Sequence, residues 1–312
     1  MPVKIDEAVR RTLDLKGELD EIVDMTLASK NQLSMIAEGG GYAALLSTSA
    51  TFRSLLGANV GCYFPREYMI YAAPYASENE VVFIFTRRSP IPPRIIDVIK
   101  TCGLMRLKTI LVVLNKISEE DEELLDYVEF LIEIEVEDDK LALNHFMAEN
   151  TFLTLIAIEA ALKSENRERA RNILEELSEI SFEEDKSIRN ILRNCIQSRR
   201  SIIFSGPPLY GLALKICRDL NVNSNSNITL YKTGEHPYVT RTISEKDYVI
   251  IMKTELEDKS AREISNFLKI RGLNSEIIEY KGDPLIATIE MGGKILPQLY
   301  EIMPKITNED VW

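Results

Sequence analysis

The chain has 312 residues, of which 45% are hydrophobic and 28% are charged, and its formal net charge at pH 7 is −12. This length and composition predict two globular domains, and the negative charge argues against nucleic acid or an anionic membrane as a partner. The apolar runs are too short to span a bilayer, and the cysteines form no C-x-x-C pair. We therefore expect a soluble, cytoplasmic protein with neither a metal ion nor an organic cofactor.

Helical patterns occupy residues 3–30 and dominate again at 139–197. Elsewhere, short apolar strands alternate with helices. Strands are predicted at 33–37, 59–63, 80–86 and 108–114, and again at 201–205, 227–231, 247–253 and 275–280. Helices are predicted at 42–56, 66–73 and 92–102, at an acidic solvated stretch 118–128, and at 209–220, 237–243, 258–271 and 284–303. This alternation predicts an α/β fold with parallel sheets flanked by helices.

The two halves of the chain resemble each other at a constant offset of 168 residues. Glu67 in P-R-E-Y-M corresponds to Glu235 in T-G-E-H-P, and Val81 of the third predicted strand corresponds to Val249. A constant offset predicts two copies of one supersecondary unit. We expect an N-terminal helical segment at 1–30, a first domain at 31–164, and a second domain with the connecting helices and the C-terminal tail at 165–312.

The third strand of the first copy ends in T-R-R-S-P-I-P-P, which starts at Thr86. Ser89 or a neighbour and the prolines favour the start of a helix. Amides at a helix N-terminus attract anions at the carboxyl edge of a parallel sheet. Arg87 and Arg88 beside them suit a phosphomonoester, because a guanidinium binds phosphate through two parallel donors. The alternative is that both arginines pair with carboxylates of the protein itself.

A second candidate anion site is the glycine turn after the first strand. Gly39, Gly40 and Gly41, followed by Tyr42, leave bare backbone that a ligand can approach. The alternative is a tight strand–helix turn that binds nothing. The spacing is not G-x-G-x-x-G, so it does not favour a dinucleotide.

The second copy differs at the matching places. Glu255, Glu257 and Asp258 follow its third strand and repel an anion, so only the first copy is predicted to hold phosphate. Glu235 and His236 form an acid–imidazole pair that suits proton transfer near neutral pH. The alternative for this pair is an ordinary surface loop.

From about residue 33 onward, the chain resembles a tandem pair of SIS (sugar isomerase) domains, as in the isomerase half of glucosamine-6-phosphate synthase. The segment L209-Y-G-L-A-L-K-I-C-R-D-L followed by L230-Y-K-T-G-E235 parallels the family's L-Y-P-I-A-L-E-G-A-L-K-L-K-E followed by A-Y-A-A-G-E, and P65-R-E-Y matches A-S-E-F. The resemblance implies two flavodoxin-like SIS domains, a sugar-phosphate ligand, a homodimer and no glutaminase domain.

The family's functional residues fall on altered positions. Its phosphate loop S-Q-S-G-E-T falls on residues 86–91, and the serine of its C-G-T-S loop falls on Gly41. Its enediol base falls on Val222, and its ring-opening histidine falls on Tyr238, two positions from His236. Lys305 is the only candidate for its C-terminal lysine.

Three hypotheses follow from this pattern. The chain is an aldose–ketose isomerase of a hexose or amino-hexose 6-phosphate, with Glu235 or Glu67 as a relocated base and His236 opening the ring. Alternatively, it is a sugar-phosphate sensor or regulatory protein that has lost the base. The third hypothesis is a subunit of a larger assembly with no affinity for sugar phosphates.

Overall fold

The computed structural model describes residues 4–137, 139, 141–183, 185–224 and 226–303. The chain forms two compact units that divide between Ile180 and Ser181, not between residues 164 and 165. The difference arises because helix α7 (Arg167–Ser178) packs against α6 (Leu143–Leu162) of the first unit. No helix among the described residues is long and apolar enough to cross a membrane.

The first unit contains a five-stranded parallel sheet in the order β2-β1-β3-β4-β5. The central strands are continuous apolar runs that are buried on both faces, as parallel strands between helix layers require. The strands are β1 (Leu33–Ala37), β2 (Val60–Tyr63), β3 (Val81–Thr86), β4 (Lys108–Val113) and β5 (Phe130–Glu133). Strand β5 was not predicted from the sequence.

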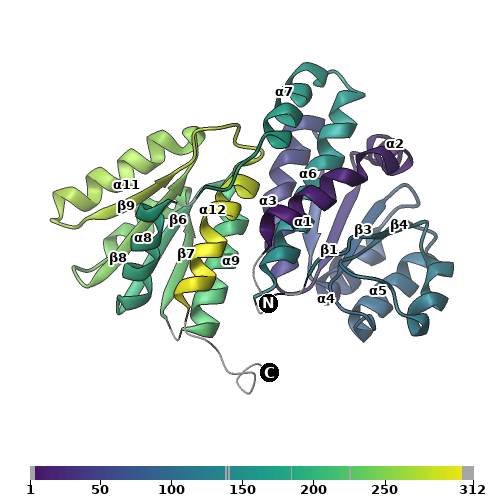
Figure 1. The fold of residues 1–312 in the computed structure, drawn as a ribbon, viewed down its shortest axis with the longest axis horizontal. Helices are drawn as coiled ribbons and strands as arrows, with labels where there is room; N and C mark the ends of the chain where they lie inside the picture. Colours follow the sequence, from purple (N-terminus) through teal and green to yellow (C-terminus); the bar gives the residue numbers. More distant parts are fainter. Residues whose placement is uncertain (1–3, 138, 140, 184, 225, 304–312) are drawn as a thin grey trace. The chain divides into compact units, whose positions relative to one another are not determined.

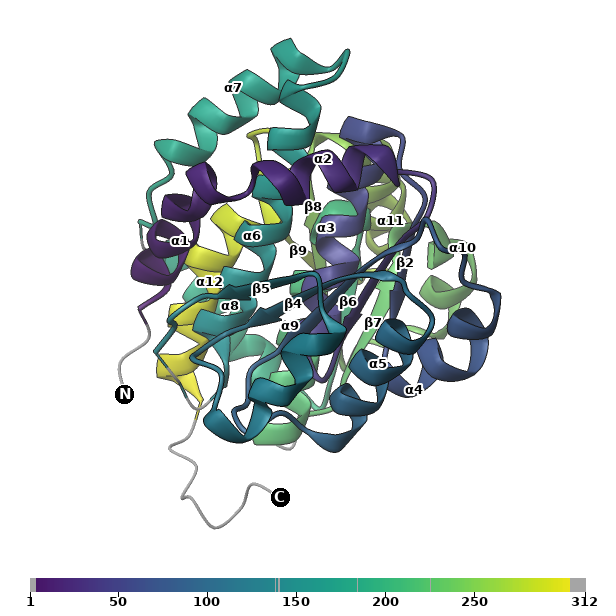
Figure 2. The same ribbon diagram turned by 90° about the vertical axis from the view of Figure 1, so that its right-hand side faces the viewer.

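One face of this sheet is covered by α3 (Gly40–Leu56) and α6, and the other by α5 (Pro93–Leu104), as Figure 1 shows. Nearly every residue of α6 is buried, because α3, α7 and two N-terminal helices pack around it. Figure 2 shows these N-terminal helices, α1 (Ile5–Leu13) and α2 (Asp20–Ala28), crossing over α6. They are joined by the 3₁₀ turn η1 (Asp14–Glu18).

Short helical turns complete the α5 face. They are α4 (Pro65–Glu67), the π-helical turn η2 (Tyr68–Ala72), the 3₁₀ turn η3 (Ala73–Tyr75) and the 3₁₀ segment η4 (Glu119–Tyr127). The predicted acidic helix is therefore a 3₁₀ helix, and it packs against α5.

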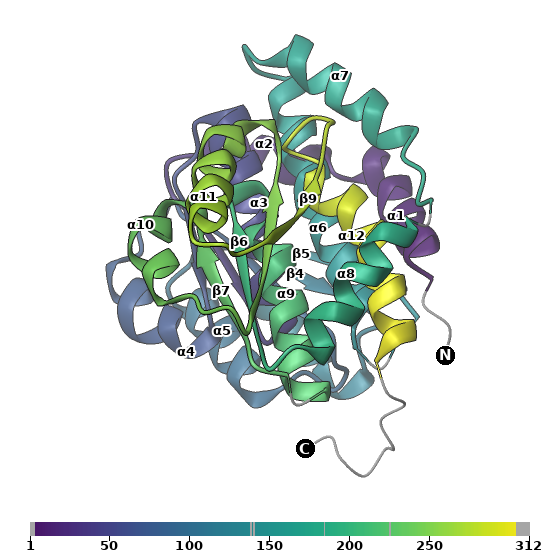
Figure 3. The ribbon, with the colours of Figure 1, turned by 90° about the vertical axis from the view of Figure 1, so that its left-hand side faces the viewer.

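The second unit contains a four-stranded parallel sheet in the order β7-β6-β8-β9. Figure 3 shows α10 and α11 on one side of it and α8, α9 and α12 on the other. The strands are β6 (Arg200–Ser205), β7 (Ile228–Lys232), β8 (Asp247–Lys253) and β9 (Ser275–Glu279). The helices and turns are α8 (Lys186–Gln197), α9 (Pro207–Asn223), η5 (Thr233–Glu235), α10 (His236–Val239), η6 (Thr240–Thr242), η7 (Glu255–Glu257), α11 (Asp258–Ile270) and α12 (Ala287–Ile302).

The two sheets differ in the strand that follows the fourth one along the sheet. In the first unit, β4 lies between β3 and β5, and its residues are almost fully buried. In the second unit, β9 is the last strand among the described residues, with Glu276, Ile277 and Glu279 exposed. The alternation of strands and helices predicted from the sequence is confirmed in both units.

The offset between the halves is not constant through the sheets. Pairing between the first and second strands keeps the offset of 168. In the third strands, however, Leu33 lies beside Val81, whereas Ser201 lies beside Tyr248. The predicted correspondence of Val81 with Val249 is therefore wrong by one residue.

Candidate functional site

The glycine turn lies at the carboxyl end of β1 and leads directly into α3. Gly39 adopts φ 56° and ψ −126°, a conformation that favours glycine, and it occupies the N-cap of α3. No described side chain caps this helix, and the Gly41 amide donates to the Glu38 carbonyl at 3.0 Å. The first turn of α3 therefore presents the positive end of a 17-residue helix at the edge of the sheet.

The second segment of the site is the loop after β3, which is adjacent to β1 in the sheet. Thr86 is buried, and its hydroxyl accepts from the Arg88 amide at 3.4 Å. The Ile91 amide donates to Asp121 Oδ2 at 2.9 Å, so a buried carboxylate of η4 holds this loop. Ser89 is exposed and does not cap α5. The helix instead begins at Pro93, one of the predicted first-turn prolines, after an N-cap at Pro92.

Arg87 is engaged by a carboxylate from α6. Its Nε donates to Glu149 Oε1 at 2.9 Å, and its Nη2 donates to Glu149 Oε2 at 2.5 Å. The Glu149 side chain is only 1% exposed, and that of Arg87 is 18% exposed. For Arg87, the structure thus matches the alternative that the arginine pairs with a carboxylate of the protein. Such a buried pair is costly to break, because the remaining charge loses its partner away from water.

The Glu149 carboxylate also lies against the glycine turn. A Cβ added to Gly41 falls 2.9 Å from Glu149 Oε1 and 2.8 Å from Ala37 Cβ. Gly41 is therefore needed as a glycine to make room for the carboxylate. A negative charge consequently lies beside the first turn of α3, where an anionic ligand was predicted.

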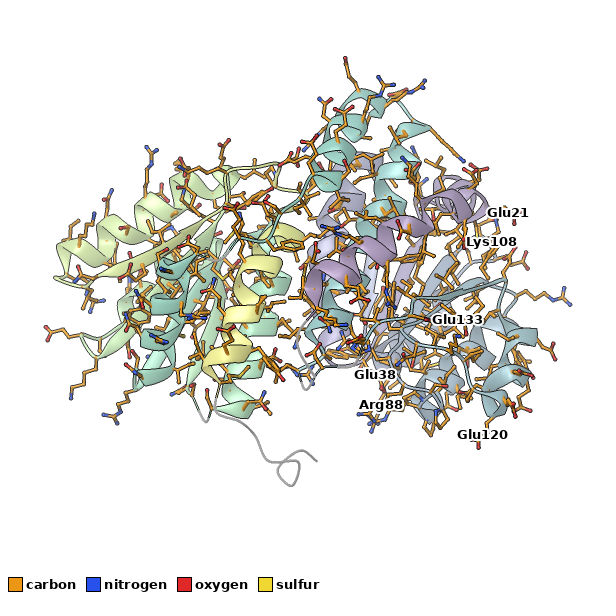
Figure 4. The ribbon with its side chains drawn as sticks, in the orientation of Figure 1. Glu21, Glu38, Arg88, Lys108, Glu120 and Glu133 are labelled. Atoms are coloured by element: carbon orange, nitrogen blue, oxygen red, sulfur yellow. The ribbon has the colours of Figure 1, made fainter. Side chains whose placement is uncertain are left out.

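Arg88 remains directed toward solvent. Its side chain is exposed, whereas that of Arg87 is held by Glu149. Figure 4 shows Arg88 at the same end of the first unit as Glu38, with its side chain extending away from the ribbon. The predicted segments Gly39–Tyr42 and Thr86–Ser89 are thus brought together at the carboxyl end of adjacent strands, and Arg88 is an exposed cation there.

Glu67 lies at this edge too. The Tyr42 and Phe64 rings stack with centroids 4.1 Å apart, which joins the glycine turn to the turn after β2. In that turn the Phe64 amide donates to Glu67 Oε2 at 3.2 Å. The carboxylate is exposed, and its bond is to the backbone of its own turn.

Glu235 also accepts a hydrogen bond from the backbone of its own turn, in the second unit: the Lys232 amide donates to its Oε2 at 2.8 Å. His236 does not pair with it: His236 Nε2 lies 3.4 Å from Oε2 of Glu263 on α11. The Glu235–His236 pair predicted from the sequence is therefore not formed. Tyr238, onto which the family's histidine falls, is 81% exposed.

Val222, at the position of the family's base, lies near the end of α9 and is 69% exposed. Its neighbour Asn221 exchanges two hydrogen bonds with Ile228, at the amino end of β7. Glu235 follows the carboxyl end of the same strand. The base position and the proton-transfer candidates are thus at opposite ends of the second sheet, and Lys305 lies outside the described residues.

The acidic residues after β8 are held within the second unit. Glu257 Oε2 accepts from the Thr254 amide at 2.8 Å and from its hydroxyl at 2.6 Å. The Glu257 carboxylate also occupies the space where a Cβ on Gly206, at the turn after β6, would lie. Lys253 pairs with Asp258 and lowers the pKa of that carboxyl. Each unit therefore has a glutamate carboxylate against the glycine of its first strand–helix turn.

Sequence reasoning missed Glu149, Asp121 and the placement of Glu257. The available signal for Glu149 was a glutamate inside a largely apolar helix, since a buried carboxylate requires a partner. The described residues contain no group of three or more His, Cys, Asp or Glu side chains that could hold a metal ion.

Solved structures share this fold over nearly its whole length. The C-terminal domain of glucosamine-fructose-6-phosphate aminotransferase from Francisella tularensis has a TM-score of 0.73 at 13% identity, covering 96% of this chain and 93% of that one. Glucosamine-6-phosphate deaminase from Thermotoga maritima has a TM-score of 0.68 at 15% identity, covering 98% and 97%. A Clostridium difficile protein described as a phosphosugar isomerase has a TM-score of 0.69 at 15% identity, covering 98% and 96%.

No protein-family model and no curated protein matches this sequence. At the identities of the structural matches, the likeness establishes the fold. The predicted architecture of two parallel sheets flanked by helices, and the resemblance to tandem SIS domains at the level of that fold, are confirmed.

Proposed function

We propose that this chain binds a sugar phosphate at the carboxyl edge of the first sheet and does not isomerise it. The observation that carries the proposal is the convergence of Arg88 and the uncapped N-terminus of α3 at the ends of two adjacent strands. A phosphate group suits this pair, because helix N-terminal amides and a guanidinium both favour a dianion. The fold shared with proteins named for phosphosugar chemistry supports the choice of ligand.

The hydrogen-bond partners of the candidate catalytic groups support a binding protein rather than an enzyme. An aldose–ketose isomerisation needs a carboxylate or similar base within hydrogen-bond reach of the proton it removes. The Glu67 and Glu235 carboxylates accept from backbone amides of their own turns, and the base position holds Val222. We infer a sensor or regulatory protein in which the sugar phosphate is a signal.

Isomerase activity is the second candidate, and the placement of Glu67 favours it. Glu67 is exposed and lies at the same sheet edge as the proposed phosphate site. The two candidates differ in proton exchange at C2 of glucose 6-phosphate in deuterated water, followed by NMR. Binding without exchange supports the sensor, and exchange that Glu67→Gln abolishes supports the isomerase.

The binding proposal is tested by calorimetric titration with fructose 6-phosphate, glucosamine 6-phosphate and unphosphorylated fructose. We expect one of the phosphates to bind and fructose not to bind. Arg88→Ala weakens that binding at least tenfold, whereas Arg218→Ala, which removes an exposed arginine of the second unit, leaves it within twofold. The absence of binding to both phosphates refutes the proposal for these ligands.

The homodimer is an expectation from the resemblance, and the cytoplasmic location is an expectation from the sequence composition. We propose a cytoplasmic homodimer whose ligand is a small sugar phosphate. Sedimentation equilibrium at micromolar concentration checks the dimer, because the chain mass is 35.5 kDa and a dimer has twice that mass.

A further inference from the structure

We propose that Glu149 determines the anion specificity of this edge, because its carboxylate is an internal ligand with which a phosphate must compete for Arg87. This inference rests on the proposed sugar-phosphate site and assigns to it a residue outside the predicted loops. According to this inference, the wild-type protein binds phosphate weakly, because Glu149 on α6 competes for Arg87.

The first support is the geometry of the ion pair. Glu149 accepts from Nε and Nη2 of Arg87, so its two oxygens use two donors on one side of the guanidinium. A phosphate binds arginine through the same kind of parallel pair. Carboxylate and phosphate therefore exclude each other at these donors.

The second support is the position of the carboxylate. Oε1 lies 2.9 Å from a Cβ built on Gly41, in the first turn of α3. The first turn of a helix stabilises one negative charge, and a second negative charge beside it is repelled. Since the Glu149 side chain is 1% exposed, water screens this repulsion poorly.

The third support is burial. Arg87 is 18% exposed, so one part of the ion pair reaches solvent while Glu149 does not. A ligand that arrives from solvent meets the arginine first, but the buried carboxylate already holds its donors. The Glu149 carboxylate therefore weakens, through its charge, the binding of a phosphate that the helix N-terminus and Arg88 attract.

The experiment compares inorganic phosphate binding to wild type, Glu149→Gln and Glu159→Gln by calorimetry at low ionic strength. Glu159 is a matched control, because it lies on the same helix and pairs with Lys16 at 3.3 Å. We expect Glu149→Gln to bind phosphate at least tenfold more tightly than wild type and Glu159→Gln to stay within twofold. Adding Arg87→Gln to the Glu149→Gln variant removes the gain.

Circular dichroism establishes that each variant is folded. If Glu149→Gln does not fold, Glu149→Asp keeps the charge that compensates Arg87 but withdraws it by one methylene. We expect this variant to bind phosphate at least threefold more tightly than wild type. Unchanged phosphate affinity in a folded Glu149 variant overturns the inference.

The outcomes separate this inference from the proposed function. If Glu149→Gln binds inorganic phosphate more tightly while no sugar phosphate binds either protein, Glu149 controls the anion site and the sugar-phosphate proposal fails. If wild type binds a sugar phosphate and Glu149→Gln binds it and inorganic phosphate with unchanged affinity, the proposed function holds and the inference is wrong.

Discussion

Replacing Arg87 by alanine is the most demanding test of the ion pair at the first sheet edge. The change leaves the Glu149 carboxylate, 1% exposed, without either of its two guanidinium hydrogen bonds. Removing one partner of a buried pair costs about 3–5 kcal/mol, because the other charge stays buried and uncompensated. We expect Arg87→Ala to lose stability within this range.

The reverse change is milder. Glu149→Ala leaves an arginine whose side chain is 18% exposed and can partly reach water. We expect it to cost about 1.5–3 kcal/mol, the range for losing hydrogen bonds to a charged group. The double replacement of Arg87 and Glu149 by methionine removes both charges together. It should cost less than about 1 kcal/mol, because replacing a buried pair by apolar side chains is often neutral.

Urea denaturation followed by far-UV circular dichroism measures these differences. With a slope of about 2–3 kcal/mol per molar urea, the urea midpoint of the Arg87→Ala transition of the first unit falls by about 1–2.5 M. The reasoning is refuted if Arg87→Ala loses less than about 1 kcal/mol, or if the double variant is as unstable as the single one. Either result places the carboxylate in contact with water or with another cation.

Three further predictions concern groups around the same core. Gly41→Ala should cost about 1–3 kcal/mol by crowding Glu149, whereas Gly17→Ala, with no atom within 4 Å of the added Cβ, should be neutral or stabilising in the same urea assay. Asp121→Ala should cost about 1–3 kcal/mol and speed amide exchange at Ile91, its backbone partner, in hydrogen-exchange mass spectrometry. Burial raises the pKa of the Cys62 thiol to about 11, so little thiolate is present at pH 8. Ellman's reagent should therefore react slowly with the Cys62 thiol of the native chain and rapidly with all four thiols once urea unfolds it. Fast reaction of Cys62 in the native state contradicts this.

The fold could be predicted because the buried parallel strands are continuous apolar runs. Strand β3, for example, reads V-V-F-I-F-T and is buried at every residue. Strand β5 escaped prediction, since it follows an acidic 3₁₀ segment and its residues are half-buried or exposed. Its pairing with β4 depends on tertiary contacts that a local pattern does not contain.

The candidate site could be predicted only in part. The convergence of the glycine turn and the arginine loop follows from parallel topology, which places the carboxyl ends of β1 and β3 together. The partner of Arg87 lies 62 residues away on α6, and nothing in the spacing of the chain connects them. A glutamate occurs at the same place in both halves, as Glu67 and Glu235, because each carboxylate accepts a hydrogen bond from a backbone amide of its own turn. From the sequence alone, this structural role was interpreted as a catalytic one.

The outer edge of β9, which pairs with no other strand in the part of the chain that the structure describes, has a consequence for self-association. An unpaired strand edge is a template for another strand, and Ile277, 43% exposed, offers apolar surface there. Glu276 precedes it on the strand, and the carboxylate of Glu279, two residues further on, pairs with Lys253. Two copies of this edge that approach one another bring their Glu276 carboxylates together, which opposes pairing. The second unit thus carries its own electrostatic barrier to fibre growth, and added salt lowers that barrier by screening the carboxylates.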